Sequence, residues 1–272
     1  MVHEELERLK EIELSILSEF DAFCRKHSLQ YYLIGGALLG AARYGHLIPW
    51  DDDVDVAMPR EDYERLYELW REDSPKGYFL QRAETDPFFA RGITKIRKNG
   101  TEILEEISCN VKMHQGIYID VFPIDYLEEA DERFVAKRAR KIRRCLSLRA
   151  IRSGYIGERK AFLKRIVRIL LCPVPLVAFD CYLTRLSTEK NTEEHRYAIL
   201  WTHNYDWRHQ LHPISVFGEG SVCSLNGENV TAPVDTEAFL KKVFGENYMQ
   251  EPPLDKQTLP HKYIEVKFEG EV

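Results

Sequence analysis

Four carboxylates stand within five residues of this chain, in the run DDDVD from Asp51 to Asp55. Like charges this close repel one another, so a folded chain tolerates them only in water or beside positive charge. Acidic and apolar residues alternate through the run, which predicts an extended strand with Val54 and Val56 facing a core. Asp53 and Asp55 then lie on the same face, where the pair can grip one hard cation. A solvated acidic loop is the alternative interpretation.

A further acid stands alone in an apolar run, GIYIDVF at residues 116–122, which predicts a second strand carrying Asp120. A buried aspartate needs a partner. If the two strands are neighbours, Asp53, Asp55 and Asp120 form a cluster suited to one or two Mg²⁺ (or Mn²⁺) ions. Such ions stabilise the attacking and leaving oxygens of a phosphoryl displacement. Asp125 is a weaker candidate than Asp120 for the third carboxylate of this cluster.

A glycine pair precedes the acidic run. The β-like residues 31–34 end at Gly35 and Gly36, and the small residues 37–42 that follow favour a helix. Backbone at a glycine pair can approach a phosphate closely because no Cβ is in the way. A simple tight turn is the alternative. Upstream of paired aspartates, however, a glycine turn and helix resemble the active-site layout of the nucleotidyltransferase superfamily.

The remaining pattern predicts an α/β (α+β) chain whose nucleotidyltransferase-like core is a mixed sheet with flanking helices. Helices are expected at residues 2–27, 60–70, 128–151, 159–190 (interrupted around Pro173 and Pro175) and 236–244. Further strands are expected at 78–82 and 91–97. The best boundary separates a catalytic core, residues 1–127, from a mainly helical part, residues 128–272. We expect the second part to bind acceptor or donor and to close on the core, or to form one continuous globule with it.

Basic residues are concentrated in one segment of an otherwise acidic chain. Between Arg133 and Arg168 there are 14 Lys and Arg against a single acid, Glu158, although the net charge of the chain is −6. This asymmetry favours an anionic partner, and we expect peripheral contact with the inner membrane leaflet. Neutralisation by acids elsewhere in the fold is the alternative. Nothing resembles a nucleic-acid recognition motif, so no nucleic-acid partner is expected.

The chain is expected to be cytoplasmic. Its longest strongly apolar run, residues 169–179, is 11 residues long, whereas a membrane-spanning helix needs ~20. The charged N-terminal residues show no export signal. The 44% share of hydrophobic residues is that of an ordinary folded protein.

Longer motifs carry a closer resemblance. The runs IGGALLGAAR (residues 34–43) and GHLIPWDDDVDVAMPR (residues 45–60) resemble the signature of the LicD family, the bacterial phosphocholine transferases related to fukutin. The run GIYIDVFPID, residues 116–125, and the tail from residue 232 to 261 also fit that family.

The resemblance implies a nucleotidyltransferase fold that uses Mg²⁺ to move a phosphorylated alcohol from its CDP-activated form onto a sugar. Such sugars belong to cell-surface glycan precursors, such as those of lipopolysaccharide or teichoic acid. It also implies that Asp53, Asp55 and Asp120 are metal ligands and catalytic residues.

Several basic residues are candidates for binding the donor. Lys95 and Arg97 alternate onto one face of their expected strand and are candidates for holding the CDP phosphates, with an exposed strand face as the alternative. Arg43, between the glycine helix and the acidic run, is a candidate for pairing with Asp51 or for touching phosphate.

Aromatic residues near the motifs are candidates for binding the alcohol. Trp50, Tyr118 and Phe122 would attract a quaternary ammonium group by cation–π interaction, with core packing as the alternative. For His261, a surface or hydrogen-bonded role is expected rather than metal binding, because it has no partner at ligand spacing.

These observations predict Mg²⁺-dependent transfer of a phospho-alcohol, most simply phosphocholine from CDP-choline, to a glycan or lipid-linked glycan. The acceptor hydroxyl attacks the β-phosphorus, CMP leaves, and Asp120 accepts the proton. One alternative is transfer of NMP from an NTP to a small molecule. Another is a noncatalytic nucleotide- or glycan-binding module, which retention of all three aspartates argues against.

Overall fold

The computed structural model describes residues 3–155, 160–191 and 195–272. Its helices are α1 (His3–His27), α2 (Gly35–Tyr44), α3 (Arg60–Asp73), α4 (Glu132–Ser153), α5 (Ala161–Leu170), α6 (Leu176–Thr188), α7 (Trp207–Gln210) and α8 (Thr236–Phe244). Its strands are β1 (Tyr32–Ile34), β2 (Asp55–Pro59), β3 (Tyr78–Gln81), β4 (Thr94–Lys98), β5 (Glu102–Glu105), β6 (Tyr118–Leu127), β7 (Tyr197–Ile199), β8 (Leu211–Pro213), β9 (Ser221–Leu225), β10 (Glu228–Ala232) and β11 (Tyr263–Lys267).

A mixed sheet organises the chain. Five strands lie in the order β1-β2-β6-β4-β3, and β7 and β8 extend the sheet from the far end of the long strand β6. β2 and β6 run parallel, with Asp55 opposite Asp120, whereas β4 runs antiparallel to β6 and sets Lys95 opposite the same Asp120. The predicted α/β class with a mixed sheet and flanking helices is therefore confirmed.

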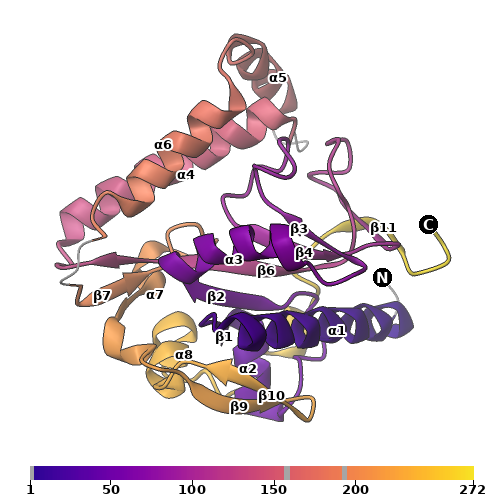
Figure 1. Ribbon diagram of the computed structural model, residues 1–272, viewed down its shortest axis with the longest axis vertical. Helices are drawn as coiled ribbons and strands as arrows, with labels where there is room; N and C mark the ends of the chain where they lie inside the picture. Colours follow the sequence, from indigo (N-terminus) through magenta and orange to yellow (C-terminus); the bar gives the residue numbers. More distant parts are fainter. Residues whose placement is uncertain (1–2, 156–159, 192–194) are drawn as a thin grey trace.

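Helices α1 and α3 lie side by side on one face of this sheet (Figure 1). The rings of Phe23 and Trp70 pack 4.9 Å apart between the two helices. Thr94 of β4 donates a hydrogen bond to the Tyr63 hydroxyl of α3, so Thr94 points to this helical face. Because side chains alternate along a strand, Lys95 points to the opposite face.

Residues after 127 complete the core. Strand β11 pairs with β5, α8 packs on α2, and β10 contacts β1. Helices α4 and α6 pair with each other and extend away from the sheet, with α5 at their far end (Figure 1). The interruption predicted around Pro173 and Pro175 is confirmed, because α5 ends at Leu170 and α6 begins after Pro175. Glu158 and Arg159 lie outside the described residues. None of the described helices combines the length and apolar character needed to cross a bilayer.

An ion pair holds the start of α3 to the sheet. Arg60 donates to both carboxylate oxygens of Asp125, at 2.8 and 2.7 Å, and Asn191 donates to one of them at 3.1 Å. The Asp125 side chain is fully buried. Asp125 is five positions along β6 from Asp120, so the two side chains point to opposite faces. Asp125 therefore serves the fold and does not replace Asp120.

We predict that Arg60→Met lowers the free energy of unfolding by about 3–5 kcal/mol, because it leaves the buried Asp125 carboxylate without its cation. Urea denaturation measures the change. Arg71→Met, an exposed position on the same helix, is the control and should stay within about 0.5 kcal/mol of the wild type. Equal stability of the two variants would contradict the structural role of the pair.

Candidate functional site

A cavity of about 360 Å³ opens on the face of the sheet opposite α1 and α3. Its lining brings together glycines, acids, bases and aromatic rings from segments far apart in the sequence. The polar lining consists of Gly35, Gly36, Asp51, Asp53, Asp55, Arg91, Lys95, Asp120, Thr202, His203, Asn204 and His261. A volume of this size suits part of a small-molecule ligand.

The sheet places the predicted acids at the cavity. Asp55 and Asp120 are neighbours in the β2–β6 register, and Asp53 reaches the cavity from the loop that precedes β2. A strand beginning at Asp51 was expected, but β2 begins at Asp55. The reason is that β1 ends at Ile34, the residue paired with Asp55, where the chain turns into α2.

Burial and mutual repulsion make these carboxylates hard to ionise. Burial, with the charges of Asp55 and Asp51 beside it, raises the pKa of Asp53 well above its usual range. Burial and the charges of Asp52 and Asp55 raise the pKa of Asp51 to about 6. Burial also raises the pKa of Asp120, although Lys95 opposes that shift. A cation among these groups would favour their charged forms.

Two bases line the cavity, and one of them was not predicted. Lys95 lies 2.7 Å from Asp120 Oδ1 and covers the Tyr118 ring, with its Nζ 3.0 Å from the ring centroid. Arg91 also lines the cavity, and it donates to Glu105 at 2.8 Å. Arg91 is about a third exposed and Lys95 3% exposed, so Arg91 is the base that a bound phosphate can reach.

Arg97 does not line this cavity, contrary to its predicted place beside Lys95. It is 1% exposed and donates to Gln81 Oε1 at 2.5 Å and to the Gly116 carbonyl. The alternative of an exposed strand face is also wrong, because both bases are buried. Lys95 and Arg97 do alternate onto one face of β4, but Gln81, the Gly116 carbonyl and the Tyr118 ring enclose Arg97.

The glycine pair lets the start of α2 approach the acids. Gly35 has φ +62°, and a Cβ there would lie 2.8 Å from Asp55 Oδ2. A Cβ on Gly36 would lie 2.0 Å from Asp51 Oδ2. Contacts below 3.0 Å force a displacement, so any larger residue at either position would push a carboxylate aside. Both glycines thus shape the acidic side of the cavity.

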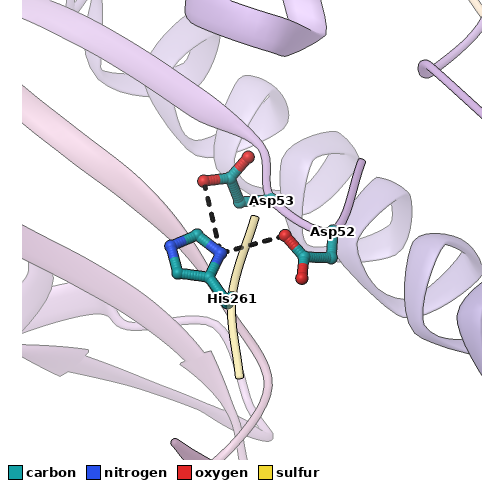
Figure 2. Close-up of side chains that lie close together, drawn as sticks. All are labelled: Asp52, Asp53 and His261. Carbon is teal, nitrogen blue, oxygen red and sulfur yellow. Dashed lines mark hydrogen bonds and ion pairs between the residues drawn. The ribbon is translucent and has the colours of Figure 1, made fainter. Parts of the chain in front are cut away.

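A second group of possible ligands overlaps the first. Oxygen and nitrogen atoms of Asp52, Asp53 and His261 all lie within 4.8 Å of one another (Figure 2). His261 Nδ1 is 2.9 Å from Asp52 Oδ1 and 4.0 Å from Asp53 Oδ2, and the Asp52 bond raises the pKa of His261. The expected hydrogen-bonded role of His261 is confirmed. Asp52 Oδ2 is buried and has no hydrogen-bond partner among the described residues, which suits a cation.

Two other predicted residues lie outside the cavity. Arg43 donates to the backbone carbonyl of Tyr248 and to the Tyr44 hydroxyl rather than pairing with Asp51. Trp50 is half-buried against the main core, which is the packing role weighed as its alternative. Neither residue contributes a side chain to the cavity lining.

An aromatic wall closes the other side of the cavity. Ring centroids lie 4.8 Å apart for Phe122 and His203, 4.9 Å for His203 and Tyr205, and 6.1 Å for Tyr205 and Phe244. All four line the cavity. Phe122 was a predicted candidate, whereas the other three were missed. The cluster of polar and aromatic residues at 201–205 was the one signal available, and it has no diagnostic spacing.

Comparison with known proteins identifies the domain that carries the acids. Residues 28–144 match the family described as LicD/FKTN/FKRP, nucleotidyltransferase domain. This segment, 117 of the 272 residues, is similar to the LicD family domain. The match includes the glycine pair, the acidic run and Asp120, and the predicted resemblance is confirmed.

Two relatives show how far the similarity extends. The chain is 42% identical over 71 residues to the lipopolysaccharide cholinephosphotransferase LicD of Haemophilus influenzae, covering 26% of this chain and 27% of that relative. It is 38% identical over 66 residues to the human ribitol 5-phosphate transferase FKRP, covering 22% and 13% respectively. The chain thus matches about a quarter of the length of the first relative and less of the second.

We predict that Asp53→Asn and Asp55→Asn abolish Mn²⁺ binding in calorimetry, because each removes a charged ligand. In chelator both variants should melt at or above the wild-type temperature, since repulsion is relieved. For the wild type, Mn²⁺ at 100 times its dissociation constant should add roughly 2.7 kcal/mol of stability. Glu219→Gln, at an exposed acid, is the control. Wild-type Mn²⁺ affinity in both aspartate variants would exclude the carboxylate site.

Proposed function

We propose that the chain transfers phosphocholine from CDP-choline to a hydroxyl group of a glycan or lipid-linked glycan and releases CMP. The observation that carries the proposal is a single cavity in which buried carboxylates adjoin a wall of aromatic rings. Carboxylates suit a cation that contacts phosphate, and aromatic faces suit a quaternary ammonium group. The names of the two relatives support phospho-alcohol transfer in general.

Asp53, Asp55 and Asp120 are the proposed ligands of Mg²⁺ or Mn²⁺, with Asp52 and His261 beside them. The bound cation would neutralise charge that develops on the transferred phosphoryl group and on the departing phosphate. The raised pKa values of Asp53 and Asp120 support this assignment, because they report negative charge held together without enough positive charge.

Side chains of the cavity then orient the reaction. The acceptor oxygen bonds to the phosphorus that carries choline, while the bond from that phosphorus to the oxygen bridging it to CMP breaks. CMP leaves with that bridging oxygen. Asp120 accepts the proton of the acceptor hydroxyl at Oδ2, because Lys95 holds Oδ1. Burial raises the pKa of Asp120, which makes it a better base.

The aromatic wall favours choline over an uncharged alcohol. Tyr205 is 43% exposed and Phe244 is half-buried, and their rings stand edge to face. A trimethylammonium group gains cation–π attraction from such faces, whereas ribitol would need hydrogen-bonding partners for its hydroxyl groups. Tyr118, a predicted member of this pocket, has its ring covered by Lys95 and so contributes less.

We predict that the protein with Mg²⁺ and CDP-choline releases CMP and no pyrophosphate. Chromatography of the nucleotide products checks this, with Asp55→Asn as the inactive control. CDP-ethanolamine, CDP-glycerol and CDP-ribitol should be poorer donors than CDP-choline. Release of pyrophosphate from CTP, without CMP from any CDP-alcohol, would instead assign the chain to nucleotidyl transfer.

We predict that Tyr205→Leu and Phe244→Leu each raise the KM for CDP-choline by about fivefold to 30-fold, as expected for the loss of a desolvated cation–π contact of ~1–2 kcal/mol. Tyr205→Phe and Phe244→Tyr keep the ring and should retain the wild-type KM. The KM for CDP-ribitol should change little in all four variants. An equal rise in KM for CDP-choline and CDP-ribitol would show that the aromatic wall does not recognise the alcohol.

A further inference from the structure

Helix α5 exposes an apolar face to solvent. Five large apolar side chains follow the helical spacing of one face, and none of the residues of α5 is buried. Their exposed fractions are 77% for Phe162, 54% for Leu163, 40% for Ile166, 72% for Ile169 and 70% for Leu170. Contiguous apolar surface of this kind marks an interaction site.

Exposed bases lie on α5 beside this face and along α4. Arg165 and Arg168 are exposed on α5, and six further bases are exposed along α4: Arg133, Lys137, Arg140, Lys141, Arg143 and Arg144. Two buried bases of α4 do pair with acids, Arg138 with Glu189 and Arg149 with Asp180. Within residues 3–155, 160–191 and 195–272, no acid forms an ion pair with the exposed bases just named. Among the described residues, ion pairs with acids of the fold therefore neutralise only the two buried bases of α4.

We propose that α5 and the exposed bases of α4 form a surface that docks on an anionic lipid bilayer. An apolar helix face flanked by Lys and Arg is the pattern of a helix that lies in the membrane interface. A second copy of the chain is a poor occupant, because a symmetric contact through α5 would bring two sets of bases together. A nucleic acid would satisfy the bases but leave the apolar face in water.

The docking surface adjoins the candidate site. Arg143 of α4 donates a hydrogen bond of 2.7 Å to the backbone carbonyl of Tyr205, which lines the cavity. Helix α4 runs from α5, at the far end of the helical pair, back toward the sheet (Figure 1). Its Arg143 thus links the docking surface to a residue of the cavity lining. A bilayer bound there would bring a lipid-linked acceptor close to the cavity. Docking itself goes beyond the proposed transfer and is measured without any turnover.

Sedimentation with vesicles tests the proposal on the full chain. We expect binding to vesicles of equal parts phosphatidylglycerol and phosphatidylcholine but not to phosphatidylcholine alone, with affinity that falls as salt rises. Arg165→Gln with Arg168→Gln should weaken binding about 25-fold, at about fivefold for each base removed. Phe162→Ser with Ile169→Ser should weaken it about tenfold or more.

Matched controls use equally exposed residues elsewhere. Val222→Ser with Leu254→Ser, at side chains 75% and 84% exposed, should retain full vesicle binding, as should Lys76→Gln with Lys256→Gln. All variants should keep the wild-type melting temperature, because none of the changed side chains is buried. Equal binding to neutral vesicles, or undiminished binding of the Phe162 and Ile169 variant, would overturn the proposal. The proposal would also be overturned if the wild-type protein bound no vesicles but formed a dimer, and if the Phe162 and Ile169 variant lost that dimer.

Discussion

The parallel pairing of β2 with β6 is the contact on which the site depends. It sets Asp55 beside Asp120 in adjacent strands and so imposes a repulsion that burial strengthens. The antiparallel neighbour β4 offsets part of this repulsion with one buried lysine, Lys95, which forms an ion pair with Asp120. The charge of this one lysine cannot also neutralise the carboxylates of the loop before β2. The fold therefore maintains a surplus of negative charge at a place where stability alone would not keep it.

That surplus explains the surroundings of the cavity. The glycine pair at the start of α2 leaves room for Asp51 and Asp55 where any Cβ would collide with them. Arg60, by contrast, takes Asp125 out of the cluster and uses it to hold α3 to the sheet. Neighbouring acids of similar sequence context thus have different roles, because strand alternation turns them to opposite faces.

The cavity is completed by residues outside the segment that matches the family. Residues 28–144 supply the acids, the glycines, Arg91 and Lys95, whereas His203, Tyr205, Phe244 and His261 come from later in the chain. Under the proposed function, the acids of the matched domain would act on the phosphates and the aromatic wall would contact the alcohol. The arrangement fits relatives that are named for different alcohols.

Local patterning was sufficient for much of this protein. The acid and apolar alternation, the glycine turn and the motif around Asp120 predicted the sheet class, the resemblance of residues 28–144 to the LicD family domain, and the three aspartates that share the cavity. Helix α8 also begins and ends where the sequence predicted, at Thr236–Phe244. These features depend on residues close in the chain, where periodicity and turn chemistry are informative.

Tertiary structure alone decided which side chains face the cavity. It brought in Arg91 and enclosed Arg97, although both lie in one short stretch around β4. It also built the aromatic wall from Phe122, the 203–205 loop and the end of α8. Strand pairing and loop closure join segments whose separation in the chain leaves no periodic signal, so the sequence could name the chemistry of the acids but not the walls around them.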